Sequence, residues 1–131
     1  QVPLSDPVIR IGDRCLIGRG GGIVGHLEIV IEDDVFFGHH VYVTDQNHGY
    51  ENLDLPIGQQ TMPERPVYIG AGSWLGHGTV VLPGARIGRH CVIGAGSVVR
   101  GEIPDFSVAV GNPARVVRRY VDGEGWVRVG G

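Results

Sequence analysis

One histidine lies in the longest part of the chain that shows no repeating pattern. This residue, His48, belongs to the irregular segment 44–66, which begins Thr-Asp-Gln-Asn-His-Gly. An imidazole with an ordinary pKa of about 6.5 can act as a general base near neutral pH. Asp45 and Asn47 could orient that ring or contact a substrate, although both residue types are also common in turns for local reasons. The alternative is that His48 is an exposed loop histidine without a chemical role.

The residues on both sides of this segment follow a strict period. Aliphatic side chains recur every six residues, and small residues usually stand one and four positions after each of them. The interval from Ile23 to Ile31 is eight residues long, so one turn of the repeat carries a two-residue insertion. The longest run consists of Ile69, Leu75, Val81, Ile87, Ile93 and Val99. A fixed internal period of this kind predicts a repeat fold.

A six-residue period fits neither an α-helix nor a plain alternating strand. It fits a short strand followed by a turn, three of which close a triangular coil that stacks on the next coil at about 4.8 Å. We therefore expect an all-β parallel β-helix, a single domain over residues 1–131 with coils over about 8–43 and 67–111. Cys15 and Cys91 occupy small-residue positions, so we expect them to be buried packing residues rather than reactive thiols.

The C-terminal segment, residues 112–131, is expected to leave the solenoid. Asn112-Pro113 would end the coils, because proline suits the first position of a helix. Residues 114–120 have the composition of a short C-terminal helix. The tail 121–131 contains Trp126 among alternating valines; it could form a strand on a neighbour or fray.

Composition limits the classes of function. The chain has 131 residues with 23 glycines, which the period orders, and a formal net charge of −3. A negatively charged chain is not expected to bind nucleic acid or an anionic membrane surface. No apolar run approaches the roughly 18–20 residues of a membrane span, and two cysteines are too few for a disulfide framework. We expect a cytoplasmic protein with no membrane span.

The repeats resemble those of the hexapeptide-repeat acyltransferases, and most closely the maltose and galactoside O-acetyltransferase branch. The resemblance rests on the insertion before Ile31, the run Val67–Gly76 and the ending Val110–Arg118, and it extends from residue 11 to about 120. It implies a left-handed β-helix and a homotrimer with active sites between subunits. It also implies acyl transfer from an acyl-CoA, acetyl-CoA by default, to a sugar or glycan acceptor.

The resemblance assigns roles in catalysis and acceptor binding to residues of the irregular segment and of the coils. His48 would be the general base that takes a proton from the acceptor's hydroxyl or amine, which then attacks the thioester. Beside it, Asp45 and Asn47 could orient the ring or contact the acceptor, a role that their residue types and position suggest. Trp74 matches a tryptophan near the acceptor pocket, with packing in the trimer as the alternative. Gly20 stands where the galactoside and maltose enzymes have an acceptor-binding asparagine, so recognition of the acceptor is expected to differ.

Coenzyme A carries a 3′-phosphate and a pyrophosphate, so its site needs cations or main-chain donors. By resemblance, Arg115 and Arg118 would approach the phosphates, and the main chain around Ala95 would meet the pantetheine arm. Arg100 would be a further cation. A main-chain N–H near Gly76 and His77 could stabilise the oxyanion, because that coil faces the thioester in the family. The alternatives are a solvated cationic helix for the arginines and a surface turn for His77. The expected CoA contacts are Gly76, His77, Ala95, Arg100, Arg115 and Arg118.

Two other functions are compatible with the same fold. One is a non-catalytic hexapeptide scaffold, which loss of His48 or of the arginines would have favoured. The other is a γ-carbonic-anhydrase-like metalloenzyme, whose zinc site needs one histidine, a long gap and then two histidines five residues apart. His39, His40, His48 and His77 do not provide that pair, so no metal is expected. The acceptor, the acyl chain and the choice between O- and N-acylation stay open.

Overall fold

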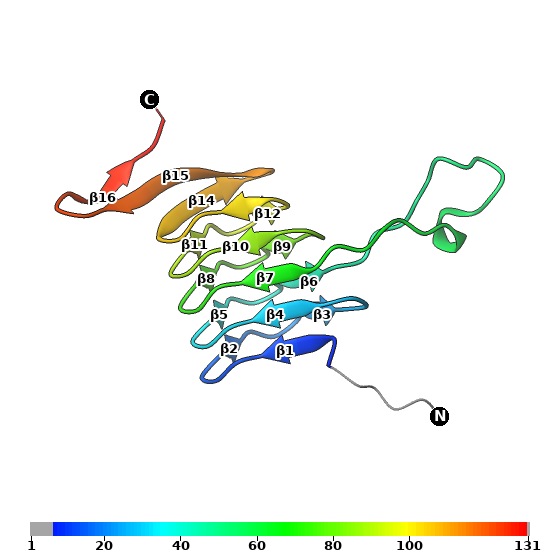
Figure 1. Cartoon of the computed structure of the whole chain (residues 1–131), viewed down its shortest axis with the longest axis horizontal. Coiled ribbons are helices and arrows are strands. Elements are labelled where there is room, and N and C mark those ends of the chain that lie inside the picture. Colours follow the sequence, from blue (N-terminus) through cyan, green and yellow to red (C-terminus); the bar gives the residue numbers. More distant parts are fainter. Residues whose placement is uncertain (1–6, 131) are drawn as a thin grey trace.

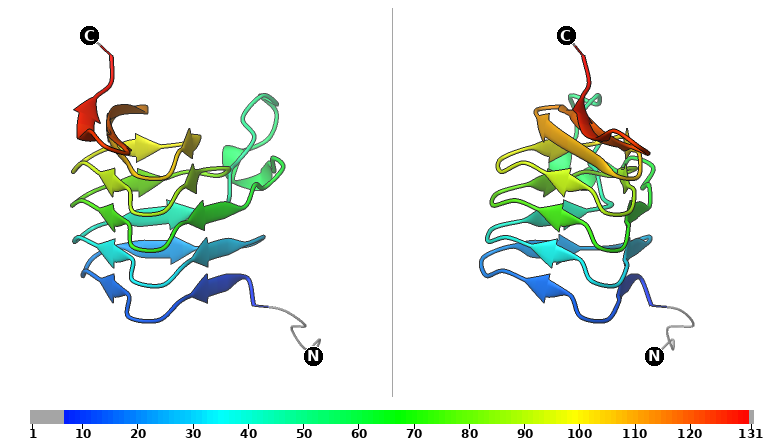
Figure 2. Two further views of the ribbon diagram at one scale, coloured as in Figure 1. Left: turned by 60° about the vertical axis from the view of Figure 1, so that its left-hand side comes forward. Right: turned by 90° about the vertical axis from the view of Figure 1, so that its left-hand side faces the viewer.

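Short strands recur along the chain with the period of the sequence repeat and stack into a parallel β-solenoid (Figure 1). This computed structural model describes residues 7–130. Each of the first four coils contributes one strand to each of three sheets, and Figure 2 shows these coils lying one above another. The sheets therefore form the sides of a column, and the long loop and the C-terminal hairpin are additions to it.

The three sheets are described in the order of their hydrogen-bonded neighbours. The first contains β1 (Ile9–Ile11), β4 (Ile29–Ile31), β7 (Val67–Ile69), β10 (Arg86–Ile87) and β13 (Glu102–Ile103). The second contains β2 (Leu16–Ile17), β5 (Phe36–Phe37), β8 (Trp74–Leu75), β11 (Val92–Ile93), β14 (Ser107–Gly111), β15 (Ala114–Val121) and β16 (Gly125–Arg128). The third contains β3 (Gly22–Val24), β6 (Tyr42–Thr44), β9 (Val80–Val81) and β12 (Val98–Val99).

The register of the sheets follows the period of the sequence. Ile69 pairs with Ile87, eighteen residues further along the chain, whereas Ile11 pairs with Ile31, which is twenty residues further. The two additional residues lie in the turn between β3 and β4, where the sequence predicts the insertion. Ile31, Ile69 and Ile87 are buried inside the column. The aliphatic positions of the second and later coils therefore form the hydrophobic core, as predicted, whereas Ile11 and Ile17 of the first coil are 45% and 48% exposed.

The two cysteines differ in burial. Cys91 is buried, and this burial raises the pKa of its thiol. Its Sγ donates to the main-chain carbonyl oxygen of Pro104 in the next coil, at 3.1 Å. Cys15, in the first coil, is half-buried. The predicted packing role is confirmed for Cys91, whereas Cys15 is only partly covered.

The prediction of a short C-terminal helix is wrong. Residues Ala114–Val121 form β15, which folds back antiparallel on β14 and pairs Val116 with Ala109. β-Branched residues such as Val116 and Val117 favour strands, and the free edge of β14 offers hydrogen-bonding groups that a helix would leave unpaired. Strand β16 then adds to β15. The tail thus contributes a strand that pairs with β15 of its own chain.

The loop 45–66 leaves the column between β6 and β7 and projects to one side (Figure 1). Its regular structure is limited to η1 (Ile57–Gln59), a single turn of 3-10 helix. Residues 51–59 are all exposed, so this part of the loop has no hydrophobic core of its own. Within residues 7–130, no helix is both long enough and apolar enough to cross a membrane.

Candidate active site

The base of the loop is held by a buried carboxylate. Asp45 follows β6 directly and is fully buried. Its carboxylate accepts the main-chain N–H groups of His26, Leu27 and Glu28 at 2.9, 2.7 and 2.8 Å. These donors belong to the turn between β3 and β4 that carries the two-residue insertion, and they replace the water that a carboxylate loses on burial. Asp45 therefore anchors the loop, and contact with a substrate would require breaking these bonds.

The C-terminal end of the loop also contacts Asp45. The main-chain N–H of Arg65 donates to the carbonyl oxygen of Asp45 at 3.3 Å. Beside it, Nδ1 of His26 lies 3.1 Å from a carboxylate oxygen of Glu64. The first and last residues of the loop and the inserted turn are therefore tied together, so the loop starts from a fixed base.

His48 is exposed on this loop, and a main-chain carbonyl determines which ring nitrogen carries its proton. Nδ1 lies 3.1 Å from the carbonyl oxygen of Gln60. A carbonyl oxygen can only accept, so in the neutral ring Nδ1 carries the hydrogen and donates it. Nε2 keeps its lone pair, which is the form that a general base needs. Asn47, the preceding residue, is also exposed.

Gln60 is a residue of the loop that the sequence did not single out. Its side-chain Nε2 donates to the carbonyl oxygens of Asn52 and Leu55 at 2.8 and 2.9 Å. Its Oε1 accepts the main-chain N–H of Asn52 at 3.2 Å. No periodic pattern in the sequence marks this residue, because the contacts depend on how an irregular loop folds.

Trp74 stands on the outer face of the second sheet beside another aromatic side chain. The rings of Trp74 and Phe36 are stacked, with centroids 6.1 Å apart and planes inclined by 14°. The two residues are 47% and 46% exposed. Together with His39 and His77 they line a hollow of about 400 Å³. Phe36 could have been found from the sequence, because it occupies the same repeat position as Trp74 and pairs with it in register.

The turn after β8 brings main-chain groups close to this hollow. Gly76 is buried, and a Cβ at this position would lie 2.8 Å from the main-chain nitrogen of Ala95. Only glycine lets these two turns approach so closely. The main-chain N–H of His77 has no acceptor among residues 7–130, whereas its carbonyl accepts from Gly96 at 2.8 Å. This N–H is therefore free to stabilise a developing oxyanion.

The three arginines that are predicted to contact CoA lie in two different parts of the structure. Arg100 and Arg115 line a cavity of about 240 Å³ between the last coil and the start of the hairpin. Arg118 lies on β15 and pairs across the ladder with Arg128 of β16. None of these arginines forms an ion pair in the described part of the chain. Their unpaired charges leave them available to a phosphorylated ligand.

The hairpin also creates an apolar hollow of about 480 Å³ where it meets the solenoid. The residues that line it are His90, Phe106, Tyr120, Asp122 and Trp126. No residue of the predicted site belongs to this group. Elsewhere within residues 7–130, no three histidine, cysteine or acidic side chains gather as they would around a metal ion.

Comparison with known proteins identifies the same six-residue repeat that the fold shows. Residues 66–101 match the family described as bacterial transferase hexapeptide (six repeats). A protein of Mycobacterium tuberculosis, named as a probable acetyltransferase, is 44% identical over 110 residues, covering 84% of this chain and 37% of that protein. The galactoside O-acetyltransferase of Lactococcus lactis is 38% identical over 135 residues, covering 88% of this chain and 65% of that protein. The chain belongs to the hexapeptide-repeat transferase family.

Solved structures of this family superpose on the chain. A galactoside acetyltransferase in complex with coenzyme A has a TM-score of 0.78 and 34% identity, covering 87% of this chain and 56% of that one. A maltose O-acetyltransferase from Clostridium difficile 630 has a TM-score of 0.72 and 34% identity, covering 85% of this chain and 58% of that one. The chain spans less than two thirds of the length of each of these relatives.

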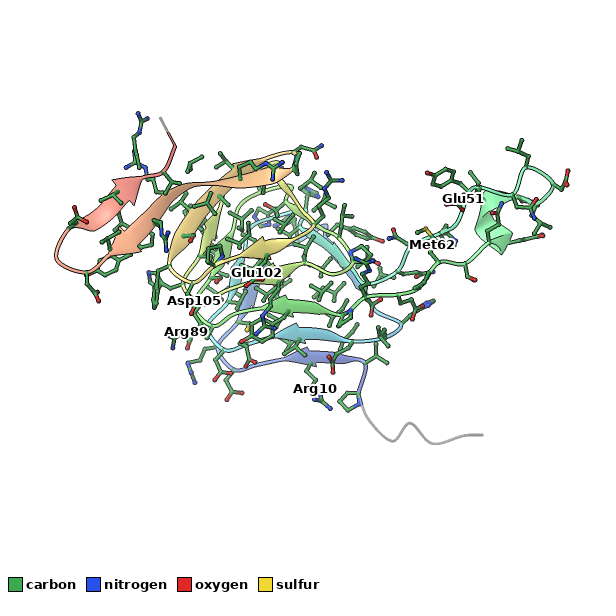
Figure 3. The ribbon with its side chains drawn as sticks, turned by 45° about the horizontal axis from the view of Figure 1, so that its top comes forward. Arg10, Glu51, Met62, Arg89, Glu102 and Asp105 are labelled. Atoms are coloured by element: carbon green, nitrogen blue, oxygen red, sulfur yellow. The ribbon has the colours of Figure 1, made fainter. Side chains whose placement is uncertain are left out.

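In this hexapeptide-repeat chain the predicted site residues lie in separate groups. His48 and Asn47 lie on the projecting loop, Trp74 and His77 share the hollow on the second sheet, and Arg100 shares its cavity with Arg115. Figure 3 shows that the loop projects from the solenoid: its labelled residues Glu51 and Met62 lie apart from the coils that carry Arg89 and Glu102. One copy of the chain therefore presents parts of a site rather than a closed pocket.

Proposed function

We propose that this protein transfers an acetyl group from acetyl-CoA to a hydroxyl group of a sugar or glycan. The observation that carries the proposal is the contact between His48 and the Gln60 carbonyl, which leaves Nε2 of an exposed imidazole ready to accept a proton. Similarity to proteins named as acetyltransferases, one of them solved with coenzyme A, supports the class of reaction.

The chemistry follows from the positions of two groups. Nε2 of His48 takes the proton of the acceptor hydroxyl as the oxygen attacks the thioester carbonyl carbon. The main-chain N–H of His77 donates to the carbonyl oxygen as negative charge develops there. His48 then returns the proton to the sulfur of the departing coenzyme A. The products are the acetyl ester and the free thiol, and the imidazole is neutral again.

The donor would be held by the last coils and the hairpin. Acetyl-CoA supplies the activated thioester, and Arg100 and Arg115 would bind its phosphates, with Arg118 as a further cation. The closely stacked main chain at Gly76 and Ala95 would lie along the pantetheine arm. Two guanidinium groups and one carboxylate, that of Glu102, line this cavity, so its net charge is positive and favours a polyanion over an uncharged ligand.

The acceptor would lie on the aromatic pair. Phe36 and Trp74 present a flat, half-exposed apolar surface, and sugars can lay the apolar face of their ring on such a surface. His77 lines the same hollow, so its free N–H would lie near the reacting carbonyl. We further propose that His48 reaches this hollow from a second copy of the chain, in a homotrimer with sites between subunits.

The test is the replacement His48→Ala beside the matched control His90→Ala, whose imidazole lies in the hollow without predicted site residues. Release of the coenzyme A thiol is measured with acetyl-CoA and a panel of sugars. We expect kcat to fall about a hundredfold or more in His48→Ala, because general base catalysis is worth that much. Calorimetry should show unchanged binding of acetyl-CoA in both variants. Full transfer by His48→Ala would contradict the proposed base, and failure of the unaltered protein to bind acetyl-CoA would contradict the proposed reaction.

A further inference from the structure

In the part of the loop beyond His48, the side chain of Gln60 forms more hydrogen bonds than any other described side chain. Residues 51–59 are exposed, and the only regular element is the three-residue turn η1. The side-chain amide of Gln60 bonds to both main-chain groups of Asn52 and to the carbonyl of Leu55. The amide nitrogen donates and the amide oxygen accepts, so this one side chain joins the two ends of the segment 52–60. These polar contacts stabilise the turn, which has no buried apolar side chains.

The main chain of the same residue contacts both the turn and His48. The N–H of Gln60 donates to the carbonyl of Ile57 at 3.0 Å, and its carbonyl accepts from Nδ1 of His48 at 3.1 Å. The neighbouring segments also pass closely: Gly49 is buried, and a Cβ there would lie 3.2 Å from the carbonyl oxygen of Thr61. The direction of the Gln60 carbonyl is therefore set by bonds on both the main chain and the side chain of that residue.

We propose that Gln60 is a positioning residue, whose side-chain amide holds its own carbonyl where it fixes the tautomer and direction of the His48 ring. This inference rests on the proposed role of His48 as the general base. Loss of the amide frees the 52–55 turn, and the carbonyl then no longer has a fixed position opposite Nδ1. The ring rotates and exchanges tautomers, so Nε2 faces the acceptor for a smaller fraction of the time. Misplacement of a catalytic group by about 1 Å can cost a hundredfold in rate.

The chain offers a matched pair of variants for the test. Gln60→Met keeps the length of the side chain and removes its three hydrogen bonds, whereas Gln59→Met makes the same change at an exposed neighbour whose side chain forms no hydrogen bond within residues 7–130. We expect Gln60→Met to lower kcat about ten- to a hundredfold, with acetyl-CoA binding and thermal unfolding unchanged. Gln59→Met should stay within about twofold of the unaltered protein. Equal activity of the two variants would overturn the inference.

A double-variant comparison separates positioning from a direct role. In a His48→Ala background, Gln60→Met should have no further effect on kcat, because the group that it positions is already absent. If the two losses multiply instead, Gln60 acts independently of His48 and the inference fails.

A second measurement does not depend on activity. Nitrogen NMR of the His48 ring should show the Nδ1–H tautomer in the unaltered protein and in Gln59→Met, and a mixture of tautomers in Gln60→Met. If His48→Ala proves fully active while the tautomer still shifts in Gln60→Met, the proposed base is wrong and the positioning contact stands. An unchanged tautomer in Gln60→Met would refute the positioning contact itself.

Discussion

Individual polar side chains hold the functional loop by bonding to main-chain groups. Asp45 satisfies three N–H groups at the base, and Gln60 satisfies two carbonyls and one N–H nearer the tip. Such bonds are directional, so they fix orientation in a way that a small apolar cluster cannot. This explains how an exposed loop with almost no regular structure can hold His48 in one orientation.

Replacement of Asp45 should show how much its three hydrogen bonds contribute to the stability of the protein. In Asp45→Asn, an amide NH₂ faces the N–H groups of Leu27 and Glu28, so one or more buried donors lose their acceptor. We expect the free energy of unfolding to fall by about 1–3 kcal/mol. The control Asp54→Asn alters an exposed carboxylate and should change it by no more than about 0.5 kcal/mol. Denaturant titration measures both, and equal stability of the two variants would contradict the anchoring role of Asp45.

At the scale of the strands, the stacking of coils builds a functional surface from residues that are far apart in sequence. Phe36 of β5 and Trp74 of β8 are adjacent because parallel pairing places the same repeat position of successive coils in one column. The irregular loop lies between these two strands in the sequence but leaves the column on another side. The second sheet therefore presents a continuous apolar face.

A change in this face should affect binding of the acceptor rather than the chemical step. We expect Phe36→Ala to raise KM for the acceptor about two- to tenfold with little change in kcat, because an aromatic contact of this kind contributes about 0.5–1.5 kcal/mol. Phe106→Ala removes a phenyl ring of similar exposure from the other hollow and should leave KM unchanged. Steady-state kinetics with varied acceptor distinguishes the variants. An unaltered KM in Phe36→Ala would remove this surface from the proposed site.

At the scale of the whole molecule, the separation of the predicted site residues on one chain suggests that a neighbouring copy completes each site. The loop that carries His48 projects from the column of its own chain (Figures 1 and 3), and His48 is exposed on it. A closed ring of identical subunits would bring each loop to a neighbour and complete every site by the same contact. This is the arrangement that we propose for the homotrimer.

Mixed assemblies test that arrangement directly. His48→Ala chains and Arg100→Ala/Arg115→Ala chains should each be impaired alone. When they are combined in equal amounts and reassembled, about a quarter of the sites should contain an intact loop and an intact donor cavity. The rate of thiol release should then exceed that of either parent. If each site belonged to a single chain, mixing would restore nothing, and the shared site would be wrong.

Much of the fold could be predicted because the repeat is local. Every sixth residue points into the column, so the period alone determines the coils, their register and the place of the two-residue insertion. The same logic placed His48 in an aperiodic loop and placed Trp74 and Gly76 on either side of a core position in one coil. It also indicated a small, packed environment for Cys91, which the structure confirms.

The structure alone decided the features that depend on contacts between distant segments. Residues 114–121 form a strand because the open edge of β14 had hydrogen bonds to satisfy, and their composition says nothing about that edge. The proton of His48 is placed by a carbonyl twelve residues away, and Asp45 is occupied by a turn seventeen to nineteen residues earlier. Periodic side chains reveal which face they bury, whereas an irregular loop takes its shape from whichever partners folding brings within hydrogen-bond distance.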